Sequence, residues 1–113
     1  MTKINSGQTL YLKAKKIILG GNMLLSKRPE MFLPNLWPVY FKKSKKIFVT
    51  DLDGNEYIDM ICAVGTNILG YANNKIDKEI KKIIEKGIMS TLNCPEEVLL
   101  TDKLIKIHKW ADQ

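Results

Sequence analysis

The sequence has few of the residue types from which catalytic and metal sites are built. Among its 113 residues there is one histidine, His108, and there are two cysteines, Cys62 and Cys94. A lone histidine excludes a histidine pair, and we expect it on the surface near a helix end. The two cysteines have neither metal-ligand spacing nor the number that a disulfide framework needs. We therefore expect reduced thiols in a cytoplasmic protein.

Long apolar stretches are also missing. Residues 1–7 are polar and lack the apolar centre of a secretory signal. No uninterrupted apolar run approaches the roughly 20 residues that cross a bilayer. A membrane is therefore not an expected partner, and the hydrophobic fraction of 45% is that of an ordinary globular domain.

Arginine is nearly absent, since Arg28 is the only one and lysine supplies most of the net charge of +6. A basic surface with interleaved aromatics is typical of proteins that bind single-stranded nucleic acid. The aromatics here alternate as strand residues do, so the densest lysine cluster favours a solvated strand edge protected from aggregation. The pattern argues against nucleic acid as the partner, and a small basic binding protein stays an alternative. The cluster and its aromatic neighbours are Phe41, Lys42, Lys43, Lys45, Lys46 and Phe48.

The residues that are present predict helices around a β-hairpin. The first helix is expected over residues 7–19, with Leu10, Ala14, Ile17 and Ile18 on its buried face. The glycine pair 20–21 should end it, because glycine readily adopts the left-handed conformation. Prolines 29, 34 and 38 predict an irregular segment over residues 22–38.

The second half of the pattern begins at a turn. Strand-prone residues at 40–41 and 47–49 precede Asp53-Gly54, a strong hairpin signal. Residues 60–71 are apolar and broken by glycines, which predicts a buried loop or short strand. A second helix should follow the cap Asn74 and end at Gly87, and a third should begin at Pro95. Its buried stripe is expected at Leu100, Leu104 and Ile107, and that of the second helix at Ile76, Ile80, Ile83 and Ile84.

Catalytic groups cannot be found from the residues alone. Asp51, Asp53 and Asp59 surround a tight turn and are interpreted as turn formers, since too few oxygens converge for a calcium loop. No lysine sits inside an apolar run, although a Schiff-base lysine must be desolvated to be nucleophilic near neutral pH. The pattern by itself indicates an α+β domain without visible catalysis.

Three stretches in this order nevertheless resemble a known family. They are Ala14–Gly21, the turn Asp51–Asp59 with the letters DLDGNEYID, and Val64–Tyr71. Together they resemble class III aminotransferases, in the branch similar to glutamate-1-semialdehyde 2,1-aminomutase, and the resemblance covers nearly the whole chain. The resemblance implies the N-terminal segment of a fold type I enzyme dependent on pyridoxal 5'-phosphate (PLP), of α+β or α/β class: a helix, an antiparallel β-hairpin and two further helices.

The resemblance also implies a division of labour. Residues 1–113 would form an N-terminal small-domain segment and the start of the large domain, and the intact parent would be a homodimer. The phosphate loop, the aspartate at the pyridine nitrogen and the Schiff-base lysine come later in the family, so we expect this chain alone to be inactive. The parent would move an amino group between an amino donor and a carbonyl substrate; the alternative is the intramolecular transfer of the aminomutase, an isomerase.

The resemblance implies roles for a few residues of this chain. Arg28 lies near the place of an arginine that contacts substrate carboxylate, at an offset from Gly21 that differs by one residue from that in the aminomutases. Val64, Gly65 and Thr66 match a loop that lines the cofactor pocket. Ser90, Thr91 and Asn93 match a segment near the dimer interface. Val64, Tyr71 and Asn74 depart from the tryptophan, histidine and proline that are usual there, and Val64 counts against strict aminomutase chemistry.

Overall fold

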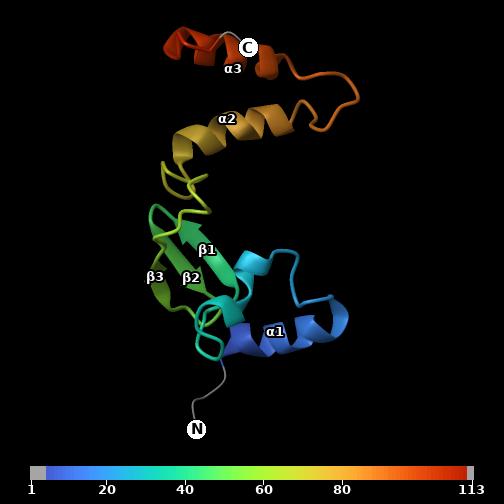
Figure 1. The fold of residues 1–113 in the computed structure, drawn as a ribbon, viewed down its shortest axis with the longest axis vertical. Coiled ribbons are helices and arrows are strands. Elements are labelled where there is room, and N and C mark those ends of the chain that lie inside the picture. The colour runs from blue at the N-terminus through green and yellow to red at the C-terminus, as the bar shows by residue number, and fades with distance from the viewer. Residues whose placement is uncertain (1–4, 112–113) are drawn as a thin grey trace. The chain divides into compact units, whose positions relative to one another are not determined.

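The computed structural model of the protein describes residues 5–111, and the chain divides into two compact units, residues 1–77 and 78–113. We describe each unit by itself. The first unit holds the long irregular segment and the sheet, and α2 begins in it (Figure 1). The elements in chain order are α1 (Ser6–Ile17), the 3-10 turns η1 (Leu25–Lys27) and η2 (Pro29–Met31), β1 (Phe41–Lys45), β2 (Phe48–Asp51), β3 (Glu56–Ile58), α2 (Asn74–Ile84) and α3 (Pro95–Ile107).

Helix α1 buries a different face from the predicted one. Its N-cap is Asn5, whose side chain accepts a hydrogen bond from the Gln8 backbone at 2.7 Å. Of the predicted face only Ala14 is buried, whereas Ile17 is 73% exposed. The buried residues are Gly7, Gln8, Tyr11 and Ala14.

The reason for this choice of face is close backbone approach. A Cβ at Gly7 would lie 3.3 Å from the backbone nitrogen of Val39, so a larger residue would push that segment away by a few tenths of an ångström. The Gln8 side chain also donates to the carbonyl of Trp37 at 2.8 Å. The helix ends at Ile17, and both following glycines have positive φ, +73° at Gly20 and +79° at Gly21, as predicted.

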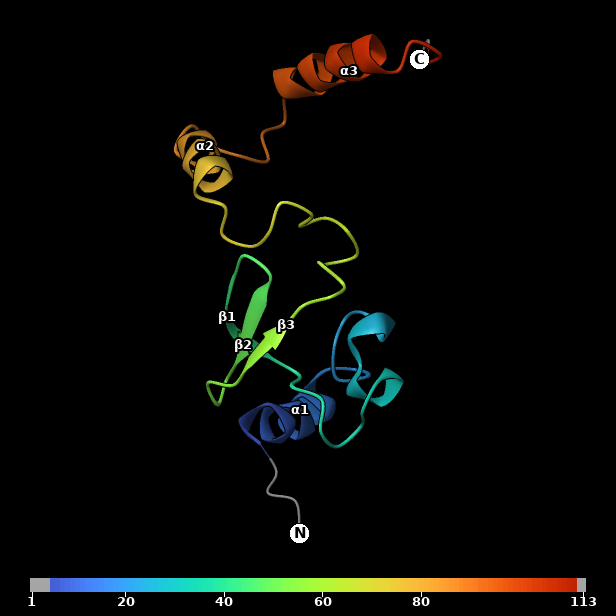
Figure 2. The same cartoon turned by 90° about the vertical axis from the view of Figure 1, so that its left-hand side faces the viewer.

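The sheet is an antiparallel meander with strand order β1-β2-β3 (Figure 2). The predicted hairpin at Asp53-Gly54 joins β2 to β3, with Val49 opposite Tyr57. Strand β1 is an edge strand and carries most of the lysine cluster, as predicted. Its pairing with β2 is irregular between Phe41 and Lys43.

Asp51 organises the β2–β3 turn. Asp51 is only 4% exposed. Its carboxylate accepts hydrogen bonds from the backbone amides of Asp53 and Asn55, from the side-chain amide of Asn55 and from the Tyr57 hydroxyl. Burial raises the pKa of Asp51, but these hydrogen bonds outweigh it and leave the pKa below its ordinary value. Asp53 in turn accepts from the backbone and the hydroxyl of Ser6, which ties the start of α1 to this turn.

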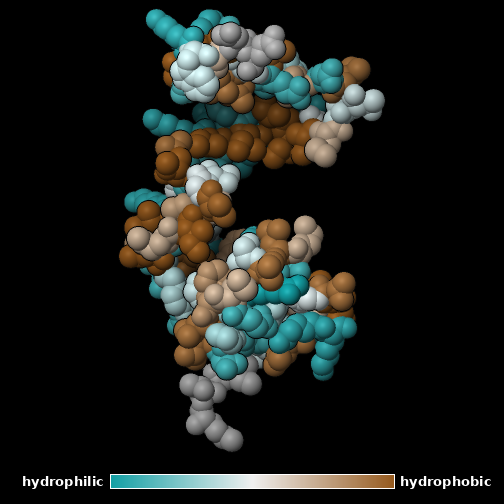
Figure 3. Space-filling view, viewed as in Figure 1, coloured by the Kyte–Doolittle hydropathy of each residue, from teal (hydrophilic) through white to brown (hydrophobic). Residues whose placement is uncertain are grey.

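The two C-terminal helices carry the predicted stripes, but the stripes are not buried. Helix α2 starts one residue after Asn73, whose side chain accepts from the Lys75 backbone at 3.1 Å, so the predicted cap Asn74 is wrong by one position. Figure 3 shows apolar side chains gathered along α2. Exposed fractions there range from 40% at Ile76 to 54% at Ile84, and Leu104 on α3 is 45% exposed. Within residues 5–111 no helix has the length and apolarity that would let it cross a bilayer.

We expect the second unit of the isolated chain to be much less stable than the sheet. Helices α2 and α3 have 11 and 13 residues and no buried residue. Helices shorter than about 12–15 residues are marginal in water without tertiary packing. In hydrogen exchange at neutral pH, the amides of α3 should exchange at least about 100-fold faster than those of β2. Equal protection of α3 and β2 would contradict this expectation.

Removal of the Asp51 charge should destabilise the first unit and change its response to acid. In Asp51→Asn the amide NH2 faces donors, so the free energy of unfolding at pH 7 should fall by about 1–3 kcal/mol. A depressed pKa adds stability that is present above the unfolded value of about 3.9 and is lost as pH falls through the folded value. Wild type should therefore lose more stability than Asp51→Asn on acidification below about pH 4.

Urea unfolding between pH 2 and pH 7 measures both effects. The matched control is Asp102→Asn, because Asp102 is exposed on α3. It should change the free energy of unfolding by only a few tenths of a kcal/mol. Parallel acid profiles for wild type and Asp51→Asn would show that Asp51 does not contribute as described.

Candidate functional site

Arg28 is the predicted site residue with the most constrained backbone. It closes η1 and opens η2, with φ −75° and ψ 129°. Its amide donates to the Leu25 carbonyl and its carbonyl accepts from the Met31 amide, both at 3.0 Å. The extended conformation is expected before a proline, and Pro29 is fully buried. The Arg28 backbone, from which the side chain extends, is therefore held in one conformation.

The half-buried Arg28 side chain lies against the glycine pair that follows α1. A Cβ built on Gly20 would lie 2.1 Å from one terminal nitrogen of the guanidinium and 2.9 Å from its central carbon. The Arg28 Nε is buried and has no hydrogen-bond partner. Among residues 5–111 no carboxylate oxygen lies within 4.0 Å of the guanidinium, because the ion pairs there all involve lysines.

Glu30 is the carboxylate nearest to Arg28 in sequence, but it is bound elsewhere. It accepts hydrogen bonds from the Tyr11 hydroxyl at 3.0 Å and from Lys15 Nζ at 3.4 Å. Its own backbone amide, then Tyr11 and Lys15, lower the pKa of Glu30 despite partial burial. Burial and then the hydrogen bond to Glu30 raise the pKa of Tyr11. Glu30, in η2, therefore stays ionised and is bound by Tyr11 and Lys15 of α1 rather than by Arg28.

Unused hydrogen-bonding capacity is concentrated in this segment. Within the described part of the chain, the buried side-chain atoms without a hydrogen-bond partner are Asn22 Oδ1 and Arg28 Nε. Nε faces inward, and the terminal nitrogens of the guanidinium are not among these buried unpaired atoms. A guanidinium presents a planar fork of donors that suits a carboxylate. The arrangement is therefore competent to bind a carboxylate or a similar planar anion.

The loop with Val64, Gly65 and Thr66 has a strained backbone. Four successive residues adopt positive φ: Cys62 at 49°, Ala63 at 51°, Val64 at 59° and Gly65 at 82°. Left-handed backbone costs about 1–2 kcal/mol for each residue other than glycine. The Gly65 amide donates to the Ile61 carbonyl at 3.2 Å, which closes this left-handed turn. Strain of this kind is concentrated at functional sites.

The prediction of a buried loop or short strand over residues 60–71 is only partly right. Tyr71 forms an isolated bridge with Lys46, and a Cβ at Gly70 would lie 3.1 Å from the Lys46 carbonyl oxygen, so close approach occurs there. Val64 is 88% exposed and nothing lies within 4 Å of a Cβ at Gly65. Gly70 thus permits close backbone approach, whereas Gly65 serves the left-handed turn of an exposed part of the loop.

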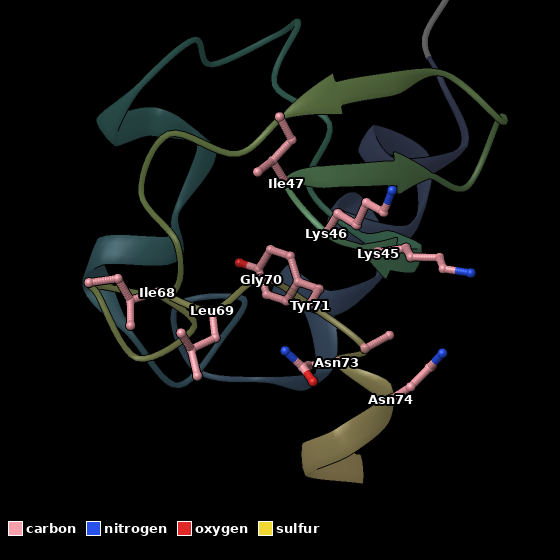
Figure 4. A pocket seen from close by; sticks show the side chains of 10 residues that line it. Lys45, Lys46, Ile47, Ile68, Leu69, Gly70, Tyr71, Asn73 and Asn74 are labelled. Atoms are coloured by element: carbon pink, nitrogen blue, oxygen red, sulfur yellow. The ribbon is translucent and has the colours of Figure 1, made fainter. Parts of the chain in front are cut away.

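A pocket of about 360 Å³ lies beside the bridge between Lys46 and Tyr71. In Figure 4 the Tyr71 ring occupies the middle of the view and the Lys45 side chain extends away from it. The Tyr71 hydroxyl donates to Asp59, and this bond, followed by burial, raises the pKa of Tyr71 to about 12. Asp59 also accepts from the backbone of Ile61 and Cys62. The Tyr71 hydroxyl and Asp59 are thus engaged with each other, and the charged side chains at the pocket are those of Lys45 and Lys46.

Ser90, Thr91 and Asn93 lie in the connection between α2 and α3. All three are exposed, and the Ser90 hydroxyl accepts from the Leu92 amide at 3.1 Å. They belong to the second unit, whereas Arg28 and residues 64–66 belong to the first. No hydrogen bond or ion pair among the described residues joins Arg28 to residues 64–66.

The described residues include no buried lysine of the kind to which PLP attaches. Every lysine within residues 5–111 is exposed, so none is desolvated as a PLP-binding lysine must be. No cluster of three or more metal-binding side chains occurs in that range either, and both cysteines are free. His108 caps the end of α3 and is exposed, as expected. No chemical step through PLP therefore follows from these residues.

Sequence reasoning missed the residues that surround Arg28. Gly20 was predicted only as a helix end, and Tyr11, Lys15 and Glu30 were not singled out. The spacing of Tyr11 and Lys15 by one helical turn places them on one face of α1, with Lys15 Nζ 5.0 Å from the Tyr11 ring centre. That spacing could have predicted that Tyr11 and Lys15 act together. Nothing in the sequence indicated that Glu30, which lies 15 residues after Lys15, is their partner.

Relatives are found over most of the chain. A 3-aminobutyryl-CoA aminotransferase from Cloacimonas acidaminovorans is 37% identical over 90% of this chain and 25% of that protein. A glutamate-1-semialdehyde 2,1-aminomutase from Methanocaldococcus jannaschii is 33% identical over 92% of this chain and 23% of that protein. The chain thus spans about a quarter of the length of the curated relatives it matches.

The fold and a family description agree with these relatives. The solved structure of a transaminase with PLP bound superposes with a TM-score of 0.77 at 25% identity, covering 94% of this chain and 24% of that one. The family description Aminotransferase class-III matches residues 34–112, which include the sheet, the strained loop and both C-terminal helices. The resemblance first visible in the DLDGNEYID turn is thereby confirmed, and the chain belongs to the class III aminotransferase family.

Proposed function

We propose that this chain forms the N-terminal part of a PLP-dependent aminotransferase that exchanges an amino group between an amino donor and a carbonyl substrate. Family membership supports the reaction class. The observation that carries the proposal to this chain is the guanidinium of Arg28, half-buried and without a carboxylate partner among the described residues. In this proposal Arg28 binds the carboxylate of a small-molecule substrate.

The proposal divides the work between this chain and the remainder of the protein. PLP, when bound, withdraws electrons from the substrate. Residues 1–113 would supply part of the small domain and the start of the large domain, with Val64, Gly65 and Thr66 along the cofactor pocket. Ser90, Thr91 and Asn93 would lie near a homodimer interface. The chain by itself would be inactive and the intact protein cytoplasmic.

An aminomutase is the second candidate. The relative from Methanocaldococcus jannaschii bears that name and matches 92% of the chain. Against it stands Val64, where the resemblance leads us to expect tryptophan in true aminomutases. The two reactions differ in whether a separate amino donor is consumed, so an assay with and without added donor distinguishes them.

The reading frame that contains this chain provides the test of function. We expect it to continue beyond Gln113 into a glycine-rich loop and a later lysine, and its product to transfer an amino group in the presence of PLP. Arg28→Lys should raise the KM for the carboxylate substrate about tenfold with little change in kcat, because lysine lacks the planar fork. The matched control is Lys27→Ala, since Lys27 is the exposed neighbour. A product without transferase or mutase activity, or an unchanged KM in Arg28→Lys, would contradict the proposal.

The strain in the proposed cofactor loop can be measured in this chain. Glycine at position 64 removes a β-branched side chain from left-handed backbone, so Val64→Gly should raise the free energy of unfolding of the first unit by about 1 kcal/mol. The control is Ile68→Gly, because Ile68 is in the same loop, 83% exposed, and outside the positive-φ residues. It should lower stability by about 0.5–1 kcal/mol. Urea unfolding followed at the sheet measures both, and destabilisation of equal size would refute stored strain at Val64.

A further inference from the structure

The contact between Gly20 and Arg28 is specific to one glycine of the chain. Gly54, Gly65 and Gly87 also have positive φ, between +82° and +92°, but a Cβ at any of them would meet nothing within 4 Å. At Gly20 an added Cβ would meet three atoms of the Arg28 guanidinium group within 3.5 Å. Backbone conformation alone therefore explains those three glycines, whereas Gly20 combines a positive φ with a close contact to a side chain.

The neighbouring glycine serves a second side chain. A Cβ at Gly21 would lie 2.7 Å from the Tyr11 ring and 2.9 Å from Lys15 Cγ. Tyr11 and Lys15 are the two side chains that bind Glu30. The first glycine of the pair thus accommodates the arginine, and the second accommodates the residues that keep the nearby carboxylate away from it.

We propose that Gly20 is a positioning residue for the carboxylate site: its missing Cβ leaves room for the Arg28 guanidinium, which is held with Nε inward before any ligand binds. The proposal rests on the proposed role of Arg28 in carboxylate binding. Nε is buried and unpaired, whereas the terminal nitrogens are not among the buried unpaired atoms. A side chain ordered in advance loses less conformational entropy on binding, so affinity is higher.

A side chain at position 20 would displace the guanidinium rather than the backbone. The atoms that a Cβ meets belong to the far part of a flexible arginine, so the arginine can move away. The anchored backbone of residues 28–29 would stay, since its hydrogen bonds to Leu25 and Met31 do not involve Gly20. The expected consequence is a folded chain with a mobile, solvent-exposed Arg28.

The single arginine makes this consequence directly measurable. Arg28 gives the only arginine Nε–Hε signal of the 113-residue chain in a proton–nitrogen correlation spectrum. In the wild-type chain we expect the Hε proton to exchange with water at least about tenfold more slowly than in free arginine, because Nε is buried. Gly20→Ala should lose most of this protection. Gly54→Ala, which also places a side chain on positive-φ backbone but without the contact, should keep it.

A second pair of variants separates the added Cβ from backbone strain. Asparagine tolerates left-handed backbone better than alanine does, so Gly20→Asn and Gly54→Asn should both fold. Dispersed amide signals of β2 and β3 provide the check of folding. Equal Hε exchange in the position-20 and position-54 variants would overturn the positioning role of Gly20.

Acetate titration connects the positioning to binding. At constant ionic strength, with chloride as the control, acetate should shift the Arg28 signal with saturation in wild type and in Gly54→Asn. In Gly20→Asn the apparent dissociation constant should rise about fivefold or more. Equal acetate affinity in all three would overturn the proposal. Loss of Hε protection in Gly20→Asn together with no acetate binding by wild type would refute Arg28 as a carboxylate ligand while the positioning by Gly20 stands.

Discussion

The hydrogen bonds that converge on Asp51 hold the first unit together, because that unit has almost no apolar core. Among the described residues the buried hydrophobic side chains are Tyr11, Ala14 and Pro29. The Asp51 carboxylate fixes the β2–β3 turn, and the same turn binds the start of α1 through Asp53 and Ser6. Polar anchors thus perform the task that apolar packing performs in larger domains. A buried carboxylate is stable only when its acceptors are satisfied, and here they are.

Polar interactions also organise the surroundings of Arg28. Glu30 could have neutralised the arginine two residues before it, but Tyr11 and Lys15 bind it instead. An arginine paired with a structural carboxylate has few free hydrogen-bond donors for a ligand. Because Glu30 is bound elsewhere, the Arg28 guanidinium keeps its donors free. Gly20 and Gly21 permit both arrangements from adjacent positions. The irregular segment of residues 22–38, with its three prolines, is rigid enough to maintain them.

Local sequence patterns predicted the helices and turns better than they predicted the tertiary contacts between them. The Asp53-Gly54 turn, the glycine pair and the start of α3 at Pro95 were predictable because each depends on the backbone preferences of its own residues. The buried face of α1 was not, since it depends on the approach of Val39 to Gly7 from 32 residues away. The left-handed turn at Val64 was equally hidden, because valine is among the residues least suited to it. The resemblance indicated Arg28, but the residues around it could not be predicted because the fold brings them together from separate parts of the sequence.

The bond between Tyr71 and Asp59 has a consequence for how the strained loop responds to its surroundings. The resemblance places a histidine at position 71 in related proteins, and histidine gains or loses a proton near neutral pH. Tyr71, with a pKa of about 12, keeps its proton, and Asp59, with a lowered pKa, stays ionised. The two ends of the loop are therefore joined by the same hydrogen bond from about pH 5 to pH 10. In this chain the hydrogen bond that closes the loop bearing Val64 is therefore insensitive to pH across that range.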